Sequence, residues 1–177
     1  MQTAEIRGTY FRVADPEWDD PVDASYAARG NGQRWNPPGM PCLYLNHDRH
    51  TAQANIRRKI DIQPFATLLD PQTAPMIVEV GLPEGIAADA FTPQGVQALG
   101  LPATYPLDAK SAAVPHEQCQ PIGQAAFDAQ LDGVDCRSAA PGGNRELAWF
   151  PRGRTAHVVY QQQIDQWWVP QPGAAQP

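Results

Sequence analysis

The sequence has no pair of closely spaced cysteines and no long apolar run, and both absences narrow the class of protein. The three cysteines, Cys42, Cys119 and Cys136, are an odd number without a Cys-x-x-Cys pair, so they predict neither a disulfide framework nor a zinc site. No run of residues approaches a membrane span, and the amino terminus lacks the basic and apolar stretches of a signal peptide. The sequence therefore predicts a cytoplasmic protein with reduced thiols and no membrane partner.

Basic residues are also scarce. Lys and Arg number 13 against 19 Asp and Glu, which gives a net charge of -6 at pH 7. A nucleic-acid-binding surface normally carries a basic patch, so we expect the chain alone to bind no nucleic acid. The basic clusters at 57–59 and 152–154 are either solvated faces or attract a small anion. His47 and His50 lack a Cys or acidic partner at metal-binding spacing, and we interpret them as surface residues.

What the chain does have is enough length for one domain with its own hydrophobic core. Its 19 prolines fall between apolar segments, where they indicate turns. We predict a domain over residues 1–169 that Trp167 and Trp168 close by packing back onto it. Residues 170–177 contain no apolar side chain larger than Ala, so a disordered tail is expected there.

Hydrophobic patterning predicts about six strands and three helices. The strands are expected at 8–13, 42–45, 76–82, 134–138, 147–150 and 156–160, and the helices at 49–60, 92–99 and 122–130. Asn46 or Asp48 is the candidate cap of the first helix. Residues 101–115 are expected to form an irregular loop of the kind that is often functional. Because the elements do not alternate as βαβ units, the prediction is a single α+β domain with a mixed or largely antiparallel sheet.

The most unusual stretch is Gly30 to Gly39, in which Arg34 and Trp35 are adjacent between glycines and a Pro-Pro-Gly turn follows. Glycines allow a backbone to approach a ligand closely, and an Arg held there suits a phosphate. The alternative is a plain hairpin turn, with Arg34 in solvent and Trp35 in the core.

Several short segments follow one another in an order that is specific as a set. They are 10–13 (Tyr-Phe-Arg-Val), 32–39, 43–45 (Leu-Tyr-Leu), 76–82, 120–123, 132–140 and 147–150. Over roughly residues 8 to 155 this set resembles the RES-domain family, the toxin half of bacterial RES–Xre toxin–antitoxin pairs.

The resemblance implies a fold similar to that of ADP-ribosyltransferases and an activity on NAD. Family members cleave the bond between nicotinamide and ribose, with phosphate, water or a protein as acceptor. By position, Arg12 matches the family Arg and Ser138 the family Ser, while Arg34 and Tyr44 fall on two further site positions. The resemblance also implies an Xre-type antitoxin as partner.

One departure from the family concerns its Glu, which belongs on the helix after Tyr44. The best-aligned position here is Asn55, and no carboxylate lies between Asp48 and Asp61. A carboxylate from a loop is the alternative source, and Asp108 and Glu117 are the candidates.

The residues suit the implied chemistry in separate ways. Arg12 and Arg34 can hold the pyrophosphate through their planar forks, Tyr44 can pack against nicotinamide or ribose, and Ser138 can hydrogen-bond to either. No metal is required. A carboxylate would stabilise the positive charge that develops on the ribose, and its loss typically costs about 2–4 kcal/mol.

Three hypotheses follow from these observations. The chain is an NAD-cleaving toxin controlled by an antitoxin. Alternatively, Asn55 has ended turnover and left a protein that binds nucleotide or antitoxin. The third is transfer of ADP-ribose to a protein target.

Overall fold

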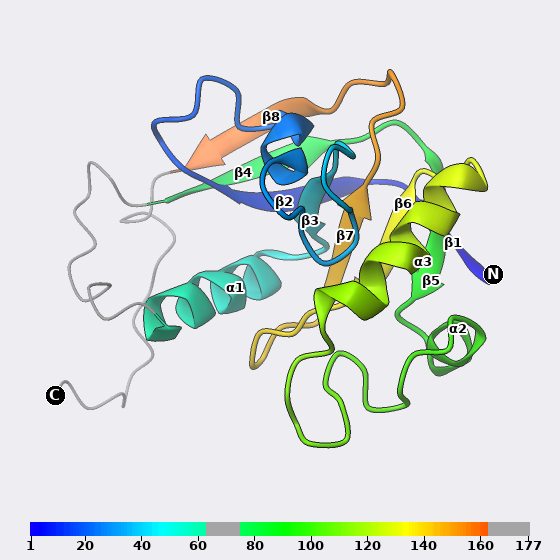
Figure 1. Cartoon of the computed structure of the whole chain (residues 1–177). Coiled ribbons are helices and arrows are strands. Elements are labelled where there is room, and N and C mark those ends of the chain that lie inside the picture. Colours follow the sequence, from blue (N-terminus) through cyan, green and yellow to red (C-terminus); the bar gives the residue numbers. More distant parts are fainter. Residues whose placement is uncertain (63–74, 163–177) are drawn as a thin grey trace, which may run out of the picture.

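The structure, a computed structural model, describes residues 1–62 and 75–162, which form one eight-stranded sheet with a few helices (Figure 1). The strands are β1 (Thr3–Ile6), β2 (Thr9–Ala14), β3 (Leu43–Asn46), β4 (Met76–Gly81), β5 (Gly85–Ala90), β6 (Gly133–Arg137), β7 (Arg145–Trp149) and β8 (His157–Gln162). Their order is β1-β5-β6-β7-β3-β2-β4-β8. Within the described chain β5 and β6 pair in parallel and the other neighbours are antiparallel, so the predicted α+β class with a mixed sheet is confirmed.

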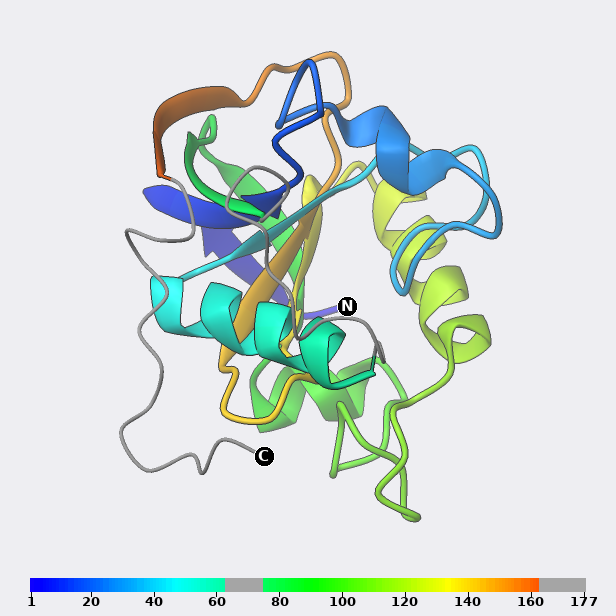
Figure 2. The ribbon, with the colours of Figure 1, turned by 90° about the vertical axis from the view of Figure 1, so that its left-hand side faces the viewer.

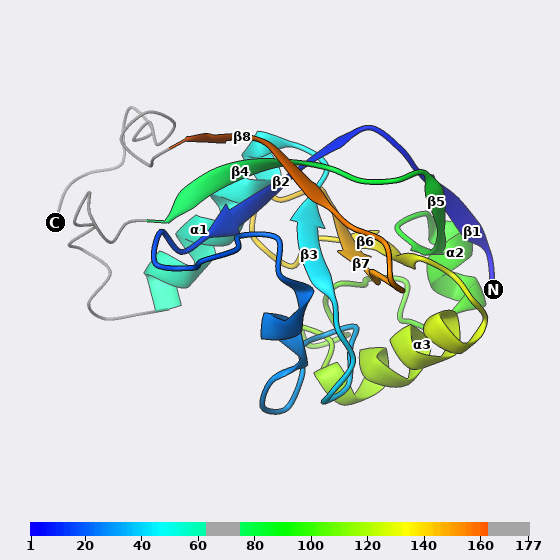
Figure 3. The same cartoon turned by 90° about the horizontal axis from the view of Figure 1, so that it is seen from above.

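The helices are α1 (Arg49–Ile62), α2 (Pro93–Ala98) and α3 (His116–Asp128), with a short 3₁₀ helix, η1 (Ala24–Ala28). Figure 1 shows α1 to the left and α3 to the right of the central strands β3 and β7, and Figure 2 shows the same helices from the side. In Figure 3, η1 lies to the left and α3 to the right of the lower end of β3. Asp48, and not Asn46, caps α1, since its Oδ1 accepts a hydrogen bond from the amide of Thr51 at 2.6 Å.

The sheet separates two hydrophobic clusters, because alternate side chains of a strand point to opposite faces. On β7, Ala148 belongs to the cluster around Trp35, while Leu147 and Trp149 belong to the cluster around Tyr10. Trp35, Trp149 and Tyr10 are each about 1% exposed. The same alternation directs Glu146, between Arg145 and Leu147, toward the Trp35 face.

Two strands were not predicted, β1 and β5. Residues 85–90 read Gly-Ile-Ala-Ala-Asp-Ala, and the last four are buried. A strand covered on both faces and built mainly from alanines has neither the alternation nor the β-branched content of a typical strand. Residues 85–90 form a strand because they pair with two neighbouring strands, β1 on one side and β6 on the other.

The helix predicted at 122–130 begins earlier, at His116, and runs through Pro121. A proline inside a helix removes one backbone hydrogen bond, which is why the sequence suggested a later start. Burial of Cys119, Gly123 and Ala126 along one face stabilises the helix on the sheet in spite of that loss. The predicted irregular loop over 101–115 is confirmed, apart from one isolated bridge between Leu107 and Ala113.

The predicted tail at 170–177 and the packing of Trp167 and Trp168 lie outside the described residues, and the domain boundary at 169 stays a prediction. In the described ranges, no helix is both long and apolar enough to cross a membrane.

Candidate functional site

Two adjoining cavities form a cleft beside the central strands β3 and β7. Their volumes are about 530 and about 230 Å³. Five residues line both cavities: Gln33, Tyr44, Asn55, Arg58 and Glu146. The larger volume alone lies within the range of roughly 300–1,000 Å³ that is typical of small-molecule sites.

The glycine-rich stretch forms one wall of the cleft. Gly32 has a φ of +69°, and a Cβ there would lie 2.2 Å from the carbonyl oxygen of Asn36, so this turn requires glycine. The Trp35 ring is buried in the core, where its Nε1 donates to the Cys136 sulfur at 3.1 Å. Arg34 instead lines the smaller cavity. Each sequence interpretation was therefore right for one residue: Trp35 is in the core, and Arg34 is held at the cleft.

Tyr44 holds this wall in place from β3. Its hydroxyl accepts from the amide of Trp35 at 2.8 Å and donates to Asn36 Oδ1 at 2.9 Å. Burial raises the pKa of Tyr44 well above its usual range, so the hydroxyl stays protonated at neutral pH. With both hydrogen bonds made inside the protein, Tyr44 offers its ring to the cleft.

Arg12 lies at the edge of the larger cavity and is 7% exposed. Its Nη1 donates to the carbonyl of Pro21 at 2.7 Å, and its guanidinium lies 5.0 Å from the centre of the Trp18 ring. Burial lowers the pKa of Arg12 to about 10, and the nearby carboxylates of Asp23 and Asp20 oppose this shift. Arg12 is therefore still charged at neutral pH and also anchors the loop before η1.

Arg34 and Arg58 are the other cations of the cleft. Burial works against the charge of Arg34, but Tyr105, Cys136 and Glu146 raise its pKa above the ordinary value. Arg58 lines both cavities and is three residues after Asn55, so the two side chains lie on the same face of α1. Arg12 lines the larger cavity, Arg34 the smaller one and Arg58 both, so the cleft has three arginines, a residue type suited to phosphate oxygens.

Asn55 occupies the position at which the family resemblance calls for Glu, and a carboxylate lies next to it. Its amide nitrogen donates to Glu146 Oε1 at 2.6 Å and to Asn46 Oδ1 at 2.7 Å. Asn46 in turn donates to the carbonyl of Phe11 at 2.9 Å. Asn46 and Glu146 are direct partners across β3 and β7, so their side chains stand side by side on one face of the sheet.

Ser138 lies next to the cleft rather than in its lining. Its hydroxyl accepts from the amide of Ala140 at 3.1 Å, and its own amide donates to the carbonyl of Asn144 at 2.9 Å. The neighbouring residue, Ala139, lines the smaller cavity. Ser138 therefore shapes the turn between β6 and β7, and its predicted bond to a ligand stays a prediction.

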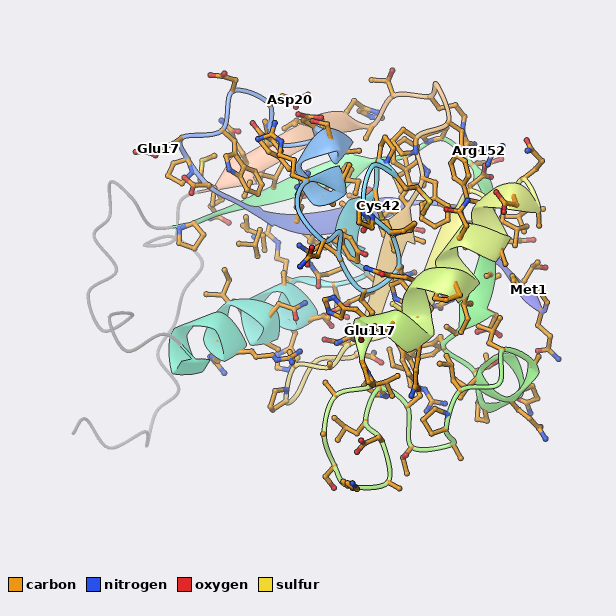
Figure 4. The ribbon with its side chains drawn as sticks, viewed as in Figure 1. Met1, Glu17, Asp20, Cys42, Glu117 and Arg152 are labelled. Carbon is orange, nitrogen blue, oxygen red and sulfur yellow. The ribbon has the colours of Figure 1, made fainter. Side chains whose placement is uncertain are left out.

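Neither of the two carboxylates suggested as substitutes lines the cleft. Asp108 Oδ1 accepts from the amides of Lys110 and Ala112 within the 101–115 loop. Glu117 is exposed in the first turn of α3, where Figure 4 labels it. Of the described residues that line the two cavities, Glu146 is the one with a carboxylate.

His47 was interpreted as a surface residue, and this was wrong. Its Nε2 lies 2.7 Å from Asp135 Oδ1, and Asp135 also accepts a pair of hydrogen bonds from Arg145. Asp135 is 2% exposed, so the buried carboxylate is balanced by two partners on the sheet face opposite Glu146. In the part of the chain that is described, no group of three or more His, Cys, Asp and Glu side chains could hold a metal ion.

Arg58 and Glu146 are two charged residues of the cleft that sequence reasoning missed. Arg58 was noted as part of a basic cluster, and its spacing of three from Asn55 was the available signal. Glu146 lies one residue before the predicted strand at 147–150, so its face could not be assigned. In the structure β7 begins at Arg145.

Fold and cleft together define an α+β protein with a cation-lined cavity over the centre of a mixed sheet. The model of the RES domain matches residues 9–171, and the chain therefore belongs to the RES domain family. Among solved structures, the chain is similar to a chain of the M. tuberculosis MbcT–MbcA toxin–antitoxin complex, with a TM-score of 0.73 and 23% identity. That match covers 91% of this chain and 86% of the other. No curated protein matches the chain.

Proposed function

We propose that this chain is a toxin of a RES-type toxin–antitoxin pair that cleaves the bond between nicotinamide and ribose in NAD. The observation that carries the proposal is the cleft, whose two adjoining cavities are lined by Arg12, Arg34 and Arg58 and also by Tyr44 and Glu146. A dinucleotide presents a pyrophosphate, two sugars and two flat rings. The cleft has a chemical partner for each kind of group.

In the proposed reaction the arginines hold the pyrophosphate by charge-assisted hydrogen bonds. The bond between ribose C1′ and the nicotinamide nitrogen breaks, and its electron pair goes to that nitrogen and neutralises the pyridinium. An oxygen of water or of inorganic phosphate then bonds to C1′, and with water one proton is released. Positive charge on the ribose in the transition state is stabilised by a nearby carboxylate.

An antitoxin partner is part of the proposal. The support for it is the family membership of the chain and its likeness to a chain from a complex described as a toxin with its antitoxin. We infer an Xre-type protein that blocks the cleft, and a cytoplasmic site of action, since NAD is the substrate.

The first experiment measures NAD consumption and nicotinamide release by the purified chain, with and without inorganic phosphate. We expect turnover, and faster turnover with phosphate if phosphate is the acceptor. Arg58→Ala should raise the KM for NAD roughly tenfold or more, because a charge-assisted hydrogen bond contributes about 1.5–3 kcal/mol. Arg7→Ala is the matched control, since Arg7 is exposed and pairs with Glu5 on β1, away from the cleft.

Two results would count against cleavage with water or phosphate as the acceptor, and a third would count against the role of the cleft. Measurable NAD affinity without nicotinamide release would favour the alternative, a protein that binds nucleotide or antitoxin and does not turn it over. Label from NAD appearing on a protein in a lysate, without free ADP-ribose or its phosphate, would favour transfer to a protein target. Loss of NAD equally fast with Arg58→Ala and with the natural chain would remove the cleft from the reaction.

A further inference from the structure

Glu146 has surroundings that suit a reacting group better than a structural one. It lines both cavities and is partly exposed to them. Its Oε1 accepts from Asn55 at 2.6 Å. Within the described ranges Oε2 has neither a hydrogen bond nor an ion pair, so it is available to a molecule in the cleft.

The amide at position 55 is explained by Glu146. A second carboxylate at 2.6 Å from Oε1 would face like charge and force one of the two to take up a proton. An asparagine instead donates to Glu146 and to Asn46, and Asn46 is itself tied to β2 through Phe11. This chain of hydrogen bonds fixes the direction of the Glu146 side chain from two neighbouring strands.

We propose that Glu146, on β7, supplies the carboxylate of the cleavage reaction, and that Asn55 on α1 is the positioning residue that orients it. In this arrangement the carboxylate that the family resemblance places on α1 comes from β7 instead, next to Asn55 in the cleft. Asn55 then does not mark an inactive site. This inference rests on the proposed NAD cleavage.

The role of Glu146 is electrostatic. As the bond from ribose C1′ to nicotinamide breaks, positive charge grows on the sugar. Glu146 lines the smaller cavity together with Tyr44 and Arg34, and this is where the sugar would lie. Stabilisation that arises only in the transition state changes kcat and leaves KM nearly constant. That separation distinguishes Glu146 from the arginines, which act in binding.

The test uses four variants of the full chain: Glu146→Gln, Glu146→Asn, Asn55→Glu, and the double exchange Asn55→Glu with Glu146→Asn. We expect Glu146→Gln to lower kcat about 100- to 1,000-fold with little change in KM. The double exchange restores a carboxylate on α1 and an amide on β7. The kcat of this double variant should be at least about tenfold higher than the kcat of Glu146→Asn.

Glu84→Gln is the matched control, because Glu84 is exposed before β5 and, among the described residues, only its backbone carbonyl is bonded, to Arg154. Thermal unfolding of each variant separates a folding defect from a catalytic one. Glu146→Gln that turns over NAD like the natural chain overturns the assignment but leaves the proposed function standing. An active Asn55→Glu beside an inactive natural chain also overturns it. A natural chain that consumes no NAD, with all variants equally inactive, removes the proposed function itself.

Discussion

Tyr44 shows how one side chain can determine the shape of the cleft without reacting. Its hydroxyl joins the amide of Trp35 to the side chain of Asn36, and Asn36 in turn donates to the carbonyls of Ala27 and Met40. Asn36 is fully buried, so every one of these bonds replaces one that water would make in the unfolded chain. The position of Arg34 depends on this network, because Arg34 precedes Trp35.

Tyr44→Phe therefore tests the network at the scale of one oxygen atom. The change leaves the amide of Trp35 and the oxygen of Asn36 without a partner, and we expect a loss of about 1–3 kcal/mol in the free energy of unfolding. The KM for NAD should rise, since the wall that presents Arg34 is loosened. Denaturant unfolding gives the stability, with Tyr160→Phe on β8 as control because Tyr160 is 50% exposed. Equal stability of the two variants would contradict the role assigned to the Tyr44 hydroxyl.

At the scale of elements, the backbone of α3 packs directly against the backbone of the glycine-rich stretch, with no side chain between them at Gly123. A Cβ on Gly123 would lie 1.7 Å from the carbonyl oxygen of Trp35. From the same helix, Gln120 donates through Nε2 to the carbonyls of Asn31 and Gln33 at 3.0 Å each. The helix therefore supports the stretch that holds Arg34, although these segments are about ninety residues apart.

Gly123→Ala is expected to have the opposite effect from an ordinary glycine replacement in a helix. Elsewhere in a helix, alanine in place of glycine stabilises by roughly 1 kcal/mol. At position 123 the added methyl group requires α3 or the Trp35 backbone to move, and overpacking of this kind costs about 1–3 kcal/mol. Thermal and denaturant unfolding measure the effect, together with the KM for NAD.

Gln118→Ala, at an exposed position of the same helix, is the control for helix propensity. It should be neutral or slightly stabilising. A Gly123→Ala variant more stable than the natural chain would show that α3 and the glycine-rich stretch are not in close contact.

At the scale of the whole molecule, the thiols report on the integrity of the core. Cys42, Cys119 and Cys136 are all buried and free, and all three lie in the cluster around Trp35. Burial raises the pKa of Cys119 to about 11, against the opposing effect of Arg34, and raises the pKa of Cys42 and Cys136 further. Because the thiolate is the reactive form, these groups are doubly protected, by burial and by protonation.

We therefore expect an aromatic disulfide reagent to modify the folded chain very slowly and all three thiols of the unfolded chain rapidly. Across a denaturant series, thiol exposure should coincide with the change in tryptophan fluorescence, as in a cooperative transition of a single domain. The measurement is the number of thiols that react at each denaturant concentration. One thiol reacting fast under native conditions would show that part of the core opens by itself.

Local sequence patterns were enough to predict several secondary-structure elements, the family and part of the candidate site. Alternation and β-branched residues marked β2 and β4, the Asp48 cap and polar pattern marked α1, and the ordered segments from Tyr10 to Phe150 indicated the family that the domain match confirms. These features are local, since each depends on residues a few positions apart. Arg34, Tyr44 and Asn55 were identified as site positions in the same way, and the structure brings all three to one cleft.

Only the tertiary structure decided which carboxylate faces the cleft. Glu146 is 91 residues from Asn55, and the pairing of β3 with β7 places them in contact. Successive side chains of a strand point to opposite faces of the sheet. Arg145 therefore bonds to Asp135 on one face, and Glu146 lines the cleft with the arginines on the other. A side chain's face depends on where its strand begins and with which strand it pairs, and those are properties of the whole sheet.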